Sequence, residues 1–172
     1  LFRSKEAEHL FLRLSAFQDE LNAWINDKTT WRSNVKNFTI GYINEGLRDR
    51  AITRNLEWGI SVPVEDYEDR RIYVWFEAVI GYLSASKEWA QLTGNKDAWR
   101  DYWENPESRS YYFMGKDNIP FHTVIWPSML LGYGGLNLPT NVPANEYLGV
   151  EGSKLSTSRN WAVWLDDYLN TF

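Results

Sequence analysis

The chain has 172 residues, of which 44% are hydrophobic and 24% are charged, a balance that is typical of globular proteins and excludes a disordered chain. Its net charge of −5 excludes a uniformly basic surface, so any contact with nucleic acid must be local. The absence of cysteine excludes disulfides and thiolate metal sites, and with only two histidines we expect no zinc site within this chain.

The sequence has no segment that predicts membrane insertion or export. No apolar run approaches the roughly 18 residues needed to cross a bilayer, and the first residues lack the apolar centre of a signal peptide. We therefore expect a cytoplasmic protein that makes no membrane contact. The chain begins with Leu1 rather than Met and stops without a tapering polar tail, so we also expect a fragment of a longer protein.

The first third of the chain has the pattern of two amphipathic helices followed by short strands. Apolar side chains recur at steps of three and four in residues 4–27, and the pattern repeats in residues 31–50. In residues 51–66 β-branched and aromatic residues alternate with polar ones around a glycine and a proline, which predicts short strands and turns.

The remaining elements alternate between strand and helix. Residues 70–76 predict a buried strand that leads directly into a helix over residues 77–92. Residues 110–115 predict a second strand before a helix that Pro127 should kink or shorten. One more strand and a glycine-bearing loop follow in residues 141–160. This order predicts an α/β fold with a parallel sheet, whose ligands collect at the carboxyl ends of the strands.

Three groups of residues could bind a ligand or take part in catalysis, and each also has a plain structural explanation. Residues 75, 78, 79 and 82 share one helix face, which is either an apolar pocket or a core face. The stretch "GKDNIPFH" (residues 115–122) joins a strand end to a helix start, which is either an anion site or a capped turn. The stretch "EGSKLSTSRN" (residues 151–160) is either a solvated loop or a mobile clamp for an anion.

Taken together, these segments resemble the methionyl-tRNA synthetases. The stretches that stand in the order and spacing of that family are "YVWFEAVIGYLSAS", "YWENP", "FMGKDNIPFHTVIWPSMLLG" and "EGSKLSTSRNWAVWLDDYL". The earlier stretch "GLRDRAITRNLEWGISVP" resembles the segment that re-enters the catalytic domain. The "GKDNIPFH" form is similar to the methionyl branch in particular, which disfavours another class I synthetase for an aliphatic amino acid.

The resemblance implies the second half of a Rossmann-like class I synthetase catalytic domain with a parallel sheet, preceded by helices. Residues 1–50 would be a helical segment from the end of the inserted connective region. Residues 51–172 would form the C-terminal half of the catalytic domain, including the KLSTS loop. The chain does not contain the H-I-G-H sequence, the cysteine knuckle for zinc or the anticodon domain of the family.

The resemblance also implies roles for individual residues. The methionine pocket would be formed by Trp75, Ala78, Val79, Tyr82, Asn118, His122 and Trp126, with Val79 in place of a usual proline. ATP would be bound by Gly115, Asp117, Tyr147, Leu148, Lys154 and Thr157. The catalytic residues would be Lys154, Ser156 and Thr157 of the loop, where Thr157 replaces the second lysine of the family's K-M-S-K-S sequence.

The implied function is that of a methionine-tRNA ligase, which uses ATP with Mg²⁺ to activate methionine and transfers it to tRNA(Met). Because half of the nucleotide site is missing from the chain, we expect the isolated polypeptide to be inactive. The alternative from a different class is a non-catalytic binding or interaction module derived from a synthetase. The pocket residues favour the ligase, whereas the missing first half and Thr157 leave room for the alternative.

Overall fold

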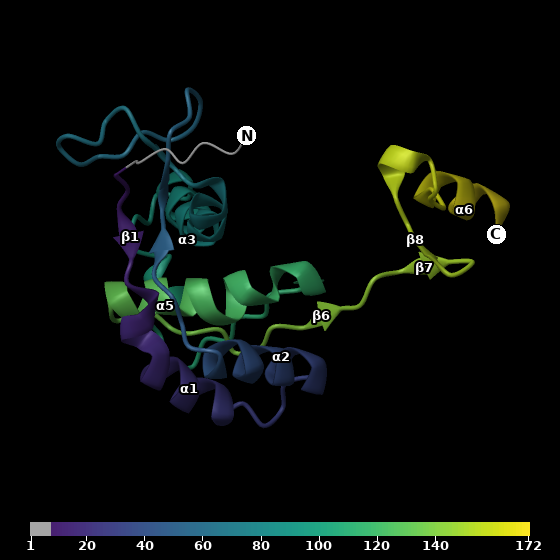
Figure 1. The fold of residues 1–172 in the computed structure, drawn as a ribbon, viewed down its shortest axis with the longest axis horizontal. Coiled ribbons are helices and arrows are strands. Elements are labelled where there is room, and N and C mark those ends of the chain that lie inside the picture. Colours follow the sequence, from purple (N-terminus) through teal and green to yellow (C-terminus); the bar gives the residue numbers. More distant parts are fainter. Residues whose placement is uncertain (1–7) are drawn as a thin grey trace, which may run out of the picture.

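The computed structural model describes residues 8–172 (Figure 1). The helices are α1 Gln18–Asn26, α2 Ser33–Asn44, α3 Val74–Leu92, α4 Arg100–Trp103, α5 Trp126–Tyr133 and α6 Leu165–Thr171. Three short 3₁₀ helices are η1 Leu14–Phe17, η2 Lys116–Asn118 and η4 Thr157–Arg159, and η3 Phe121–Ile125 is a π helix. The strands are β1 Phe11–Leu12, β2 Arg50–Ala51, β3 Thr53–Arg54, β4 Arg71–Ile72, β5 Met114–Gly115, β6 Ala144–Asn145, β7 Gly149–Val150 and β8 Ser153–Lys154.

The strands form four separate two-stranded ladders. β5 pairs with β6 in parallel, with Met114 opposite Ala144, and a parallel bridge joins Tyr111 to Asn141. The other three ladders, β1–β2, β3–β4 and β7–β8, are antiparallel. The mixture of helices and strands with a parallel pair confirms the predicted α/β class. Within residues 8–172, however, the predicted parallel sheet is reduced to one short pair.

The hydrophobic core lies where α1, α2, α3 and α5 meet η3. α2 buries Val35, Thr39 and Ile43 at steps of four, which is the core stripe of an amphipathic helix. The buried hydroxyl of Thr39 lies 2.9 Å from that of Thr123 in η3 and ties the two elements together. No helix in the described part of the chain combines the length and the hydropathy needed to cross a bilayer.

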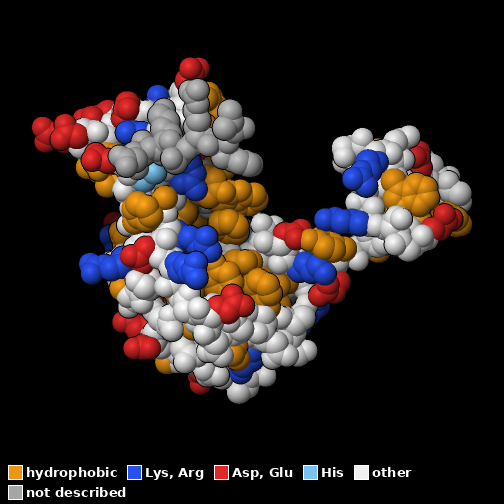
Figure 2. Space-filling view, viewed as in Figure 1, with side chains coloured by type: hydrophobic (Ala, Val, Ile, Leu, Met, Phe, Trp, Pro, Cys, Tyr) orange, Lys and Arg blue, Asp and Glu red, His pale blue; other side chains and the backbone are white. Residues whose placement is uncertain are grey.

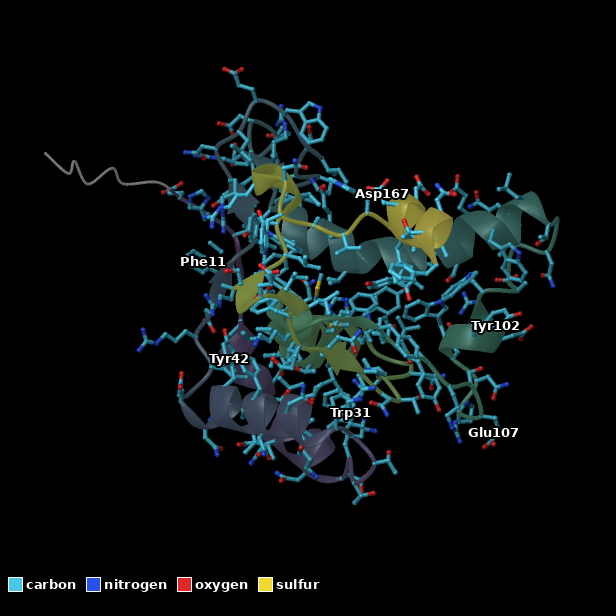
Figure 3. The ribbon with its side chains drawn as sticks, turned by 90° about the vertical axis from the view of Figure 1, so that its right-hand side faces the viewer. Phe11, Trp31, Tyr42, Tyr102, Glu107 and Asp167 are labelled. Carbon is cyan, nitrogen blue, oxygen red and sulfur yellow. The ribbon has the colours of Figure 1, made fainter. Side chains whose placement is uncertain are left out.

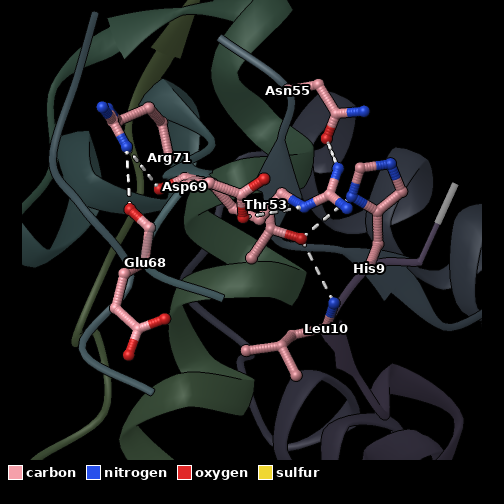
Figure 4. A network of polar contacts seen from close by, with 8 residues as sticks. His9, Leu10, Thr53, Asn55, Glu68, Asp69 and Arg71 are labelled. Carbon is pink, nitrogen blue, oxygen red and sulfur yellow. Dashed lines mark hydrogen bonds and ion pairs between the residues drawn. The ribbon is translucent and has the colours of Figure 1, made fainter. Parts of the chain in front are cut away.

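The predicted helix over residues 4–27 is correct only in its second half. Residues 4–7 lie outside the described residues, and the chain then forms β1, η1 and finally α1. Thr53 of β3 explains the extended start, because its buried hydroxyl oxygen accepts the backbone N–H of Leu10 and lies 3.0 Å from His9 Nδ1 (Figure 4). A partner distant in sequence therefore overrides the local helical pattern.

The predicted strand over residues 70–76 is also shorter than expected. β4 ends at Ile72, Tyr73 is extended, and α3 already begins at Val74. Phe76, Val79 and Leu83 are buried at steps of three and four, so the helical period starts inside the apolar run. A short apolar run alone does not distinguish a buried strand from the first turn of a buried helix. The correction places Trp75 in the first turn of α3.

The predicted shortening of the helix at Pro127 does not occur, since α5 runs through this residue to Tyr133, but the helix is widened just before it. The backbone N–H of Trp126, the residue before it, donates to the carbonyl of Phe121, five residues back, so η3 is a wide π turn. Proline has no N–H to continue the ordinary ladder, and wide turns of this kind often occur at functional sites. This turn carries His122.

The last segment of the chain stands apart from the body. After β6 an extended stretch leads to the β7–β8 hairpin and α6, which project away from the helical core (Figure 1). α6 has no buried residue, and Leu165, Leu169 and Phe172 are all largely exposed. Figure 2 shows hydrophobic side chains grouped on the flank of the body that faces this segment.

Candidate active site

Two aromatic side chains form one wall of the first side-chain cluster. Trp75 in the first turn of α3 stacks on Phe121 of η3, with ring centroids 5.1 Å apart and an interplanar angle of 23°. Trp75 remains 43% exposed, so its other face is accessible. A stacked pair of this geometry positions the indole ring firmly and leaves a flat apolar surface open to a ligand.

Tyr82 and His122 are joined further along α3. His122 Nδ1 lies 2.9 Å from the carbonyl oxygen of Asn118, and that oxygen can only accept. Nδ1 therefore carries the proton, and Nε2 accepts from the Tyr82 hydroxyl at 2.9 Å. Burial lowers the pKa of His122, although its hydrogen bond to the Asn118 carbonyl acts in the opposite direction. The ring is thus neutral at pH 7 and held in one tautomer.

A buried layer of rings supports this pair from beneath. Trp126 is 2% exposed and donates its indole N–H to the Tyr112 hydroxyl at 3.1 Å. Tyr112 packs edge-on against Tyr82 and lies next to His122, and burial raises the pKa of its hydroxyl. Trp126 therefore contacts the cluster through Tyr112 and is itself a core residue.

The remaining residues assigned to the methionine pocket divide between surface and core. Ala78 is exposed between Trp75 and Tyr82 on the same helix face, whereas Val79 is 2% exposed and packs in the hydrophobic core. Asn118 contributes its backbone carbonyl to His122. The structure thus brings Trp75, Ala78 and Tyr82 to one surface, with the buried His122 hydrogen-bonded to Tyr82.

A second cluster joins the turn after β5 to the start of the last segment. The Tyr147 hydroxyl donates to the Asp117 carboxylate, and this hydrogen bond raises the pKa of Tyr147, because the ionised phenol would have no proton to donate. Lys154 Nζ lies 3.6 Å from the centroid of the Tyr147 ring and 4.0 Å from Asp117 Oδ2. Three of the residues assigned to ATP are therefore in direct contact.

Lys116 adds a second positive charge beside the Tyr147 ring. Its Nζ lies 4.3 Å from the ring centroid and 2.5 Å from Glu146 Oε2. The hydrogen bond between them raises the pKa of Lys116 and lowers that of Glu146. A Cβ placed on Gly115 would have no neighbouring atom within 4 Å, so the backbone there is open to a ligand, and Leu148 is 71% exposed.

The stretch "EGSKLSTSRN" is a hairpin followed by one helical turn. Glu151 and Gly152, with φ of 50° and 78°, form the two-residue turn between β7 and β8. Beyond Lys154, the backbone of Ser156 pairs with Trp161, and the Ser156 and Ser158 hydroxyls lie 3.2 Å apart. Within residues 8–172, Lys154 is the residue of this stretch that reaches Asp117, and the backbone carbonyl of Thr157 accepts a hydrogen bond inside the loop.

The described residues offer little to hold a metal ion directly. Among residues 8–172, no three side chains of His, Asp or Glu come together as a ligand set. Asp117 is the carboxylate in contact with Lys154, and it already accepts from Tyr147.

Sequence reasoning missed four members of these clusters. Phe121, Tyr112, Lys116 and Glu146 each contact a residue of the two clusters, yet none was singled out. Lys116 and Phe121 lie inside the quoted "GKDNIPFH" stretch, so position alone could have indicated them. Tyr112 and Glu146 had no comparable signal, because the contact of Tyr112 with Tyr82 and that of Glu146 with Lys116 each join segments about 30 residues apart.

Comparison with known proteins shows the family of the chain. Residues 3–172 match the family described as "tRNA synthetases class I (M)". The chain belongs to this family. Among curated class I (M) synthetases, the methionine–tRNA ligase of Dehalococcoides mccartyi (strain BAV1) is 61% identical over 168 residues, which cover 98% of this chain and 30% of that protein. The methionine–tRNA ligase of Thermoplasma acidophilum is 52% identical over 165 residues, or 96% of this chain and 30% of that protein.

Solved class I (M) synthetase structures have the same fold. The methionyl-tRNA synthetase of Mycobacterium tuberculosis in complex with methionyl-adenylate superposes with a TM-score of 0.80 at 29% identity, over 98% of this chain and 32% of that one. The free form of the Mycobacterium tuberculosis enzyme gives a TM-score of 0.65 at 31% identity, and the match covers 79% of this chain and 26% of that one. These matches confirm the fold predicted from the sequence. The chain spans about a third of the length of the relatives that it matches.

Proposed function

We propose that this chain is part of a methionine-tRNA ligase, which activates methionine with ATP and transfers it to tRNA(Met). The observation that carries the proposal is the 61% identity to a curated methionine–tRNA ligase over 98% of the chain. The two side-chain clusters support it, because one presents apolar rings beside a fixed polar group and the other sets two lysines beside an exposed tyrosine ring and two carboxylates. A ligand with an apolar side chain and a nucleotide would need both kinds of surface.

The Trp75–Phe121 wall, Ala78 and Tyr82 are proposed to bind the methionine side chain. Methionine has a polarizable thioether that accepts hydrogen bonds only weakly, so shape and ring contacts must supply most of the selectivity. The neutral His122 ring and the Tyr82 hydroxyl form the fixed polar end of this surface. Val79 and Trp126 would support the wall from the core, and Asn118 would hold the His122 tautomer.

Gly115, Asp117, Tyr147 and Leu148 are proposed to bind the adenosine of ATP. The exposed Tyr147 ring could stack on a base, and the Asp117 carboxylate could accept hydrogen bonds from a ribose hydroxyl or an ammonium group. Lys154, Ser156 and Thr157 would face the phosphates. Lys154 now lies on Tyr147 and Asp117, so binding of ATP would have to exchange those contacts for phosphate oxygens.

The activation step demands positioning and charge stabilisation more than acid–base chemistry. The methionine carboxylate attacks the α-phosphate and pyrophosphate leaves, and Mg²⁺ bound with ATP would neutralise part of the phosphate charge. Lys154 would supply positive charge from the protein, and Thr157 supplies a hydroxyl in place of a second lysine. We also propose that residues 1–50 end the inserted region, that residues 51–172 form the second half of the catalytic domain, and that the protein works in the cytoplasm, where tRNA is charged.

The proposal is tested in a hybrid enzyme in which this chain replaces the matching segment of the Dehalococcoides mccartyi ligase. Methionine-dependent ATP–pyrophosphate exchange should be clear in the hybrid and absent from the isolated chain. Trp75→Ala should raise the KM for methionine about tenfold, because one ring of this size typically contributes more than 1 kcal/mol to binding. The matched control is Trp89→Ala, on the same helix and similarly exposed at 44%, which should leave the KM unchanged.

Two results would contradict the proposal. A hybrid that shows no exchange would favour the alternative of a non-catalytic module. Equal effects of Trp75→Ala and Trp89→Ala would show that the methionine surface has been placed wrongly.

A further inference from the structure

Tyr112 contacts both polar members of the first cluster from the inside of the protein. Its ring packs edge-on against Tyr82, with centroids 5.1 Å apart and an interplanar angle of 74°, and its centroid lies 5.7 Å from that of the His122 ring. Tyr112 is only 8% exposed, so it does not belong to the surface that a ligand would meet. Any effect of Tyr112 on a ligand must therefore act through Tyr82 and His122.

A closed path of contacts holds Tyr112 in place. Its hydroxyl accepts the indole N–H of Trp126 at 3.1 Å, and Trp126 packs edge-on against Trp103 of α4 with centroids 5.8 Å apart. Trp103 donates its own indole N–H to Ser86 Oγ at 2.9 Å, and Ser86 Oγ donates to the backbone carbonyl of Tyr82 at 3.0 Å. The path thus leaves α3 at the Tyr82 ring and returns to α3 at the Tyr82 backbone.

The rings along this path have little freedom to move. Tyr112, Trp103 and Trp126 are all buried. Both indole N–H groups are paired inside the protein, and a buried donor without a partner costs free energy. Another placement of any of these rings would break a hydrogen bond or open a void in the core. The inner side of Tyr82 therefore rests on a fixed support, although its outer side is open to solvent.

The environment of His122 depends on the same support. Among residues 8–172, no carboxylate lies within ion-pair distance of the His122 ring. The groups that contact the ring are the Tyr82 hydroxyl, the Asn118 carbonyl and the Tyr112 ring. Burial is the main reason why the pKa of His122 is lowered, so the pKa of this residue reports how well Tyr112 covers it.

We propose that Tyr112 is a positioning residue that fixes the Tyr82 ring and the His122 imidazole for contact with methionine. The inference rests on the proposed function, in which Tyr82 forms part of the methionine surface. Because a thioether is a weak hydrogen-bond acceptor, the affinity for methionine depends on ring contacts and hence on where the rings stand. A displaced Tyr82 ring would weaken methionine binding without altering the groups that face the phosphates.

ATP–pyrophosphate exchange by the hybrid enzyme tests the positioning role. Tyr112→Leu should raise the KM for methionine about tenfold, the upper end of what one aromatic pair contributes, and Tyr112→Phe, which keeps the ring, should raise it less than about threefold. In both variants kcat should change less than about twofold, because only ground-state binding is altered.

The matched control for Tyr112→Leu is Trp31→Leu. Trp31 is 5% exposed, packs edge-on against Trp24 and donates its indole N–H to the Thr140 carbonyl at 2.7 Å, so it has the same kinds of contact as Tyr112. Figure 3 shows Trp31 at the end of the molecule formed by α1 and α2, away from α3. Trp31→Leu should leave the KM for methionine unchanged.

Two serines of α3 offer a second, milder comparison. The hydroxyls of Ser84 and Ser86 each donate to the carbonyl four residues back, but Trp103 bonds to Ser86. Ser86→Ala should raise the KM for methionine about threefold, within the range expected for one lost hydrogen bond, whereas Ser84→Ala should not change it. Each variant loses a single hydroxyl, so this pair decides the question if Tyr112→Leu does not fold.

An NMR titration of the chain itself needs no catalytic activity. Tyr112→Leu should move the pKa of His122 upward toward its ordinary value of about 6.5, because water then reaches the ring. Trp31→Leu should leave this pKa unchanged. The chain has two histidines, and His9→Gln identifies which signal belongs to His122.

The proposal is overturned if Tyr112→Leu and Trp31→Leu raise the KM equally, because the effect would then be a general loosening of the core. A fall in kcat as large as the rise in KM overturns it too. Where Tyr112→Leu does not fold, equal KM values in the two serine variants overturn it instead. A hybrid without exchange contradicts the proposed function, and the support of His122 by Tyr112 is then decided by the titration, in which an unchanged pKa overturns it.

Discussion

The hydrogen bond between Tyr82 and His122 offers a direct test of the first cluster. Tyr82→Phe removes only the hydroxyl and leaves the ring that packs edge-on against Tyr112. His122 is 7% exposed, so its Nε2 would lose the partner now 2.9 Å away and have little access to water. A typical hydrogen bond contributes about 0.5–1.5 kcal/mol, and a buried unpaired acceptor costs about 1–3 kcal/mol.

The exposure of Tyr82 decides where in this range the effect falls. Because Tyr82 is 43% exposed, water can partly replace its hydroxyl, so we expect a loss of about 1 kcal/mol in the free energy of unfolding. This corresponds to about a fivefold change in the unfolding equilibrium. Urea unfolding followed by tryptophan fluorescence measures it, and Tyr111→Phe is the matched control, since Tyr111 is 55% exposed and its side chain forms no hydrogen bond within residues 8–172.

A double-mutant cycle then separates the pair from the individual side chains. Tyr82→Phe combined with His122→Leu should show a coupling free energy of about 1 kcal/mol, because each single variant removes the same bond. A coupling below about 0.3 kcal/mol, the usual error of additivity, would refute the assigned hydrogen bond. Equal losses in Tyr82→Phe and Tyr111→Phe would refute it as well.

Three further outcomes follow from the structure. Burial lowers the pKa of His122, so the unfolded chain binds a proton on this side chain more readily than the folded chain does. The contribution of His122 to the free energy of unfolding should therefore be fully present above about pH 6.5 and be lost as the pH falls below it. His122→Leu should flatten that part of a urea-unfolding pH series. Gly152→Ala places a side chain at φ 78°, which costs about 1 kcal/mol and should speed amide hydrogen exchange in residues 149–155, whereas Gly41→Ala in α2 should not. Lys154→Ala should lower the rate of ATP–pyrophosphate exchange by the hybrid enzyme at least tenfold, with little change in the KM for methionine. Equal rates in the variant and the unmodified hybrid would contradict the proposed contact of Lys154 with the phosphates.

Some elements could be predicted because their pattern is local. α2 follows from its period of three and four. A disturbance of the helix around Pro127 could also be expected from the missing N–H, although its form as a wide turn over residues 121–125 could not. The stretch "GKDNIPFH" was identified as a site candidate from its letters alone. His122 was singled out there, but its tautomer was not, because the Asn118 carbonyl and the Tyr82 hydroxyl had to be placed first.

Other features depended on partners far away in the sequence. The N-terminal helix was predicted too long because Thr53, more than 40 residues away, holds Leu10 in an extended conformation. The contact between Lys154, Tyr147 and Asp117 could not be read from spacing, since it joins a hairpin to a turn about 30 residues earlier. The division of Trp75 and Val79 between surface and core also required the packed structure.

By itself the sequence determined the family of this chain, because its motifs stand in the order and spacing of that family. The tertiary structure alone decided which side chains meet. It placed Trp126, Trp103 and Ser86 behind Tyr112, a grouping that no motif records, because α3, α4 and α5 meet only when the core closes. Local propensity acts over a few residues, whereas a binding surface is assembled by packing across the whole chain.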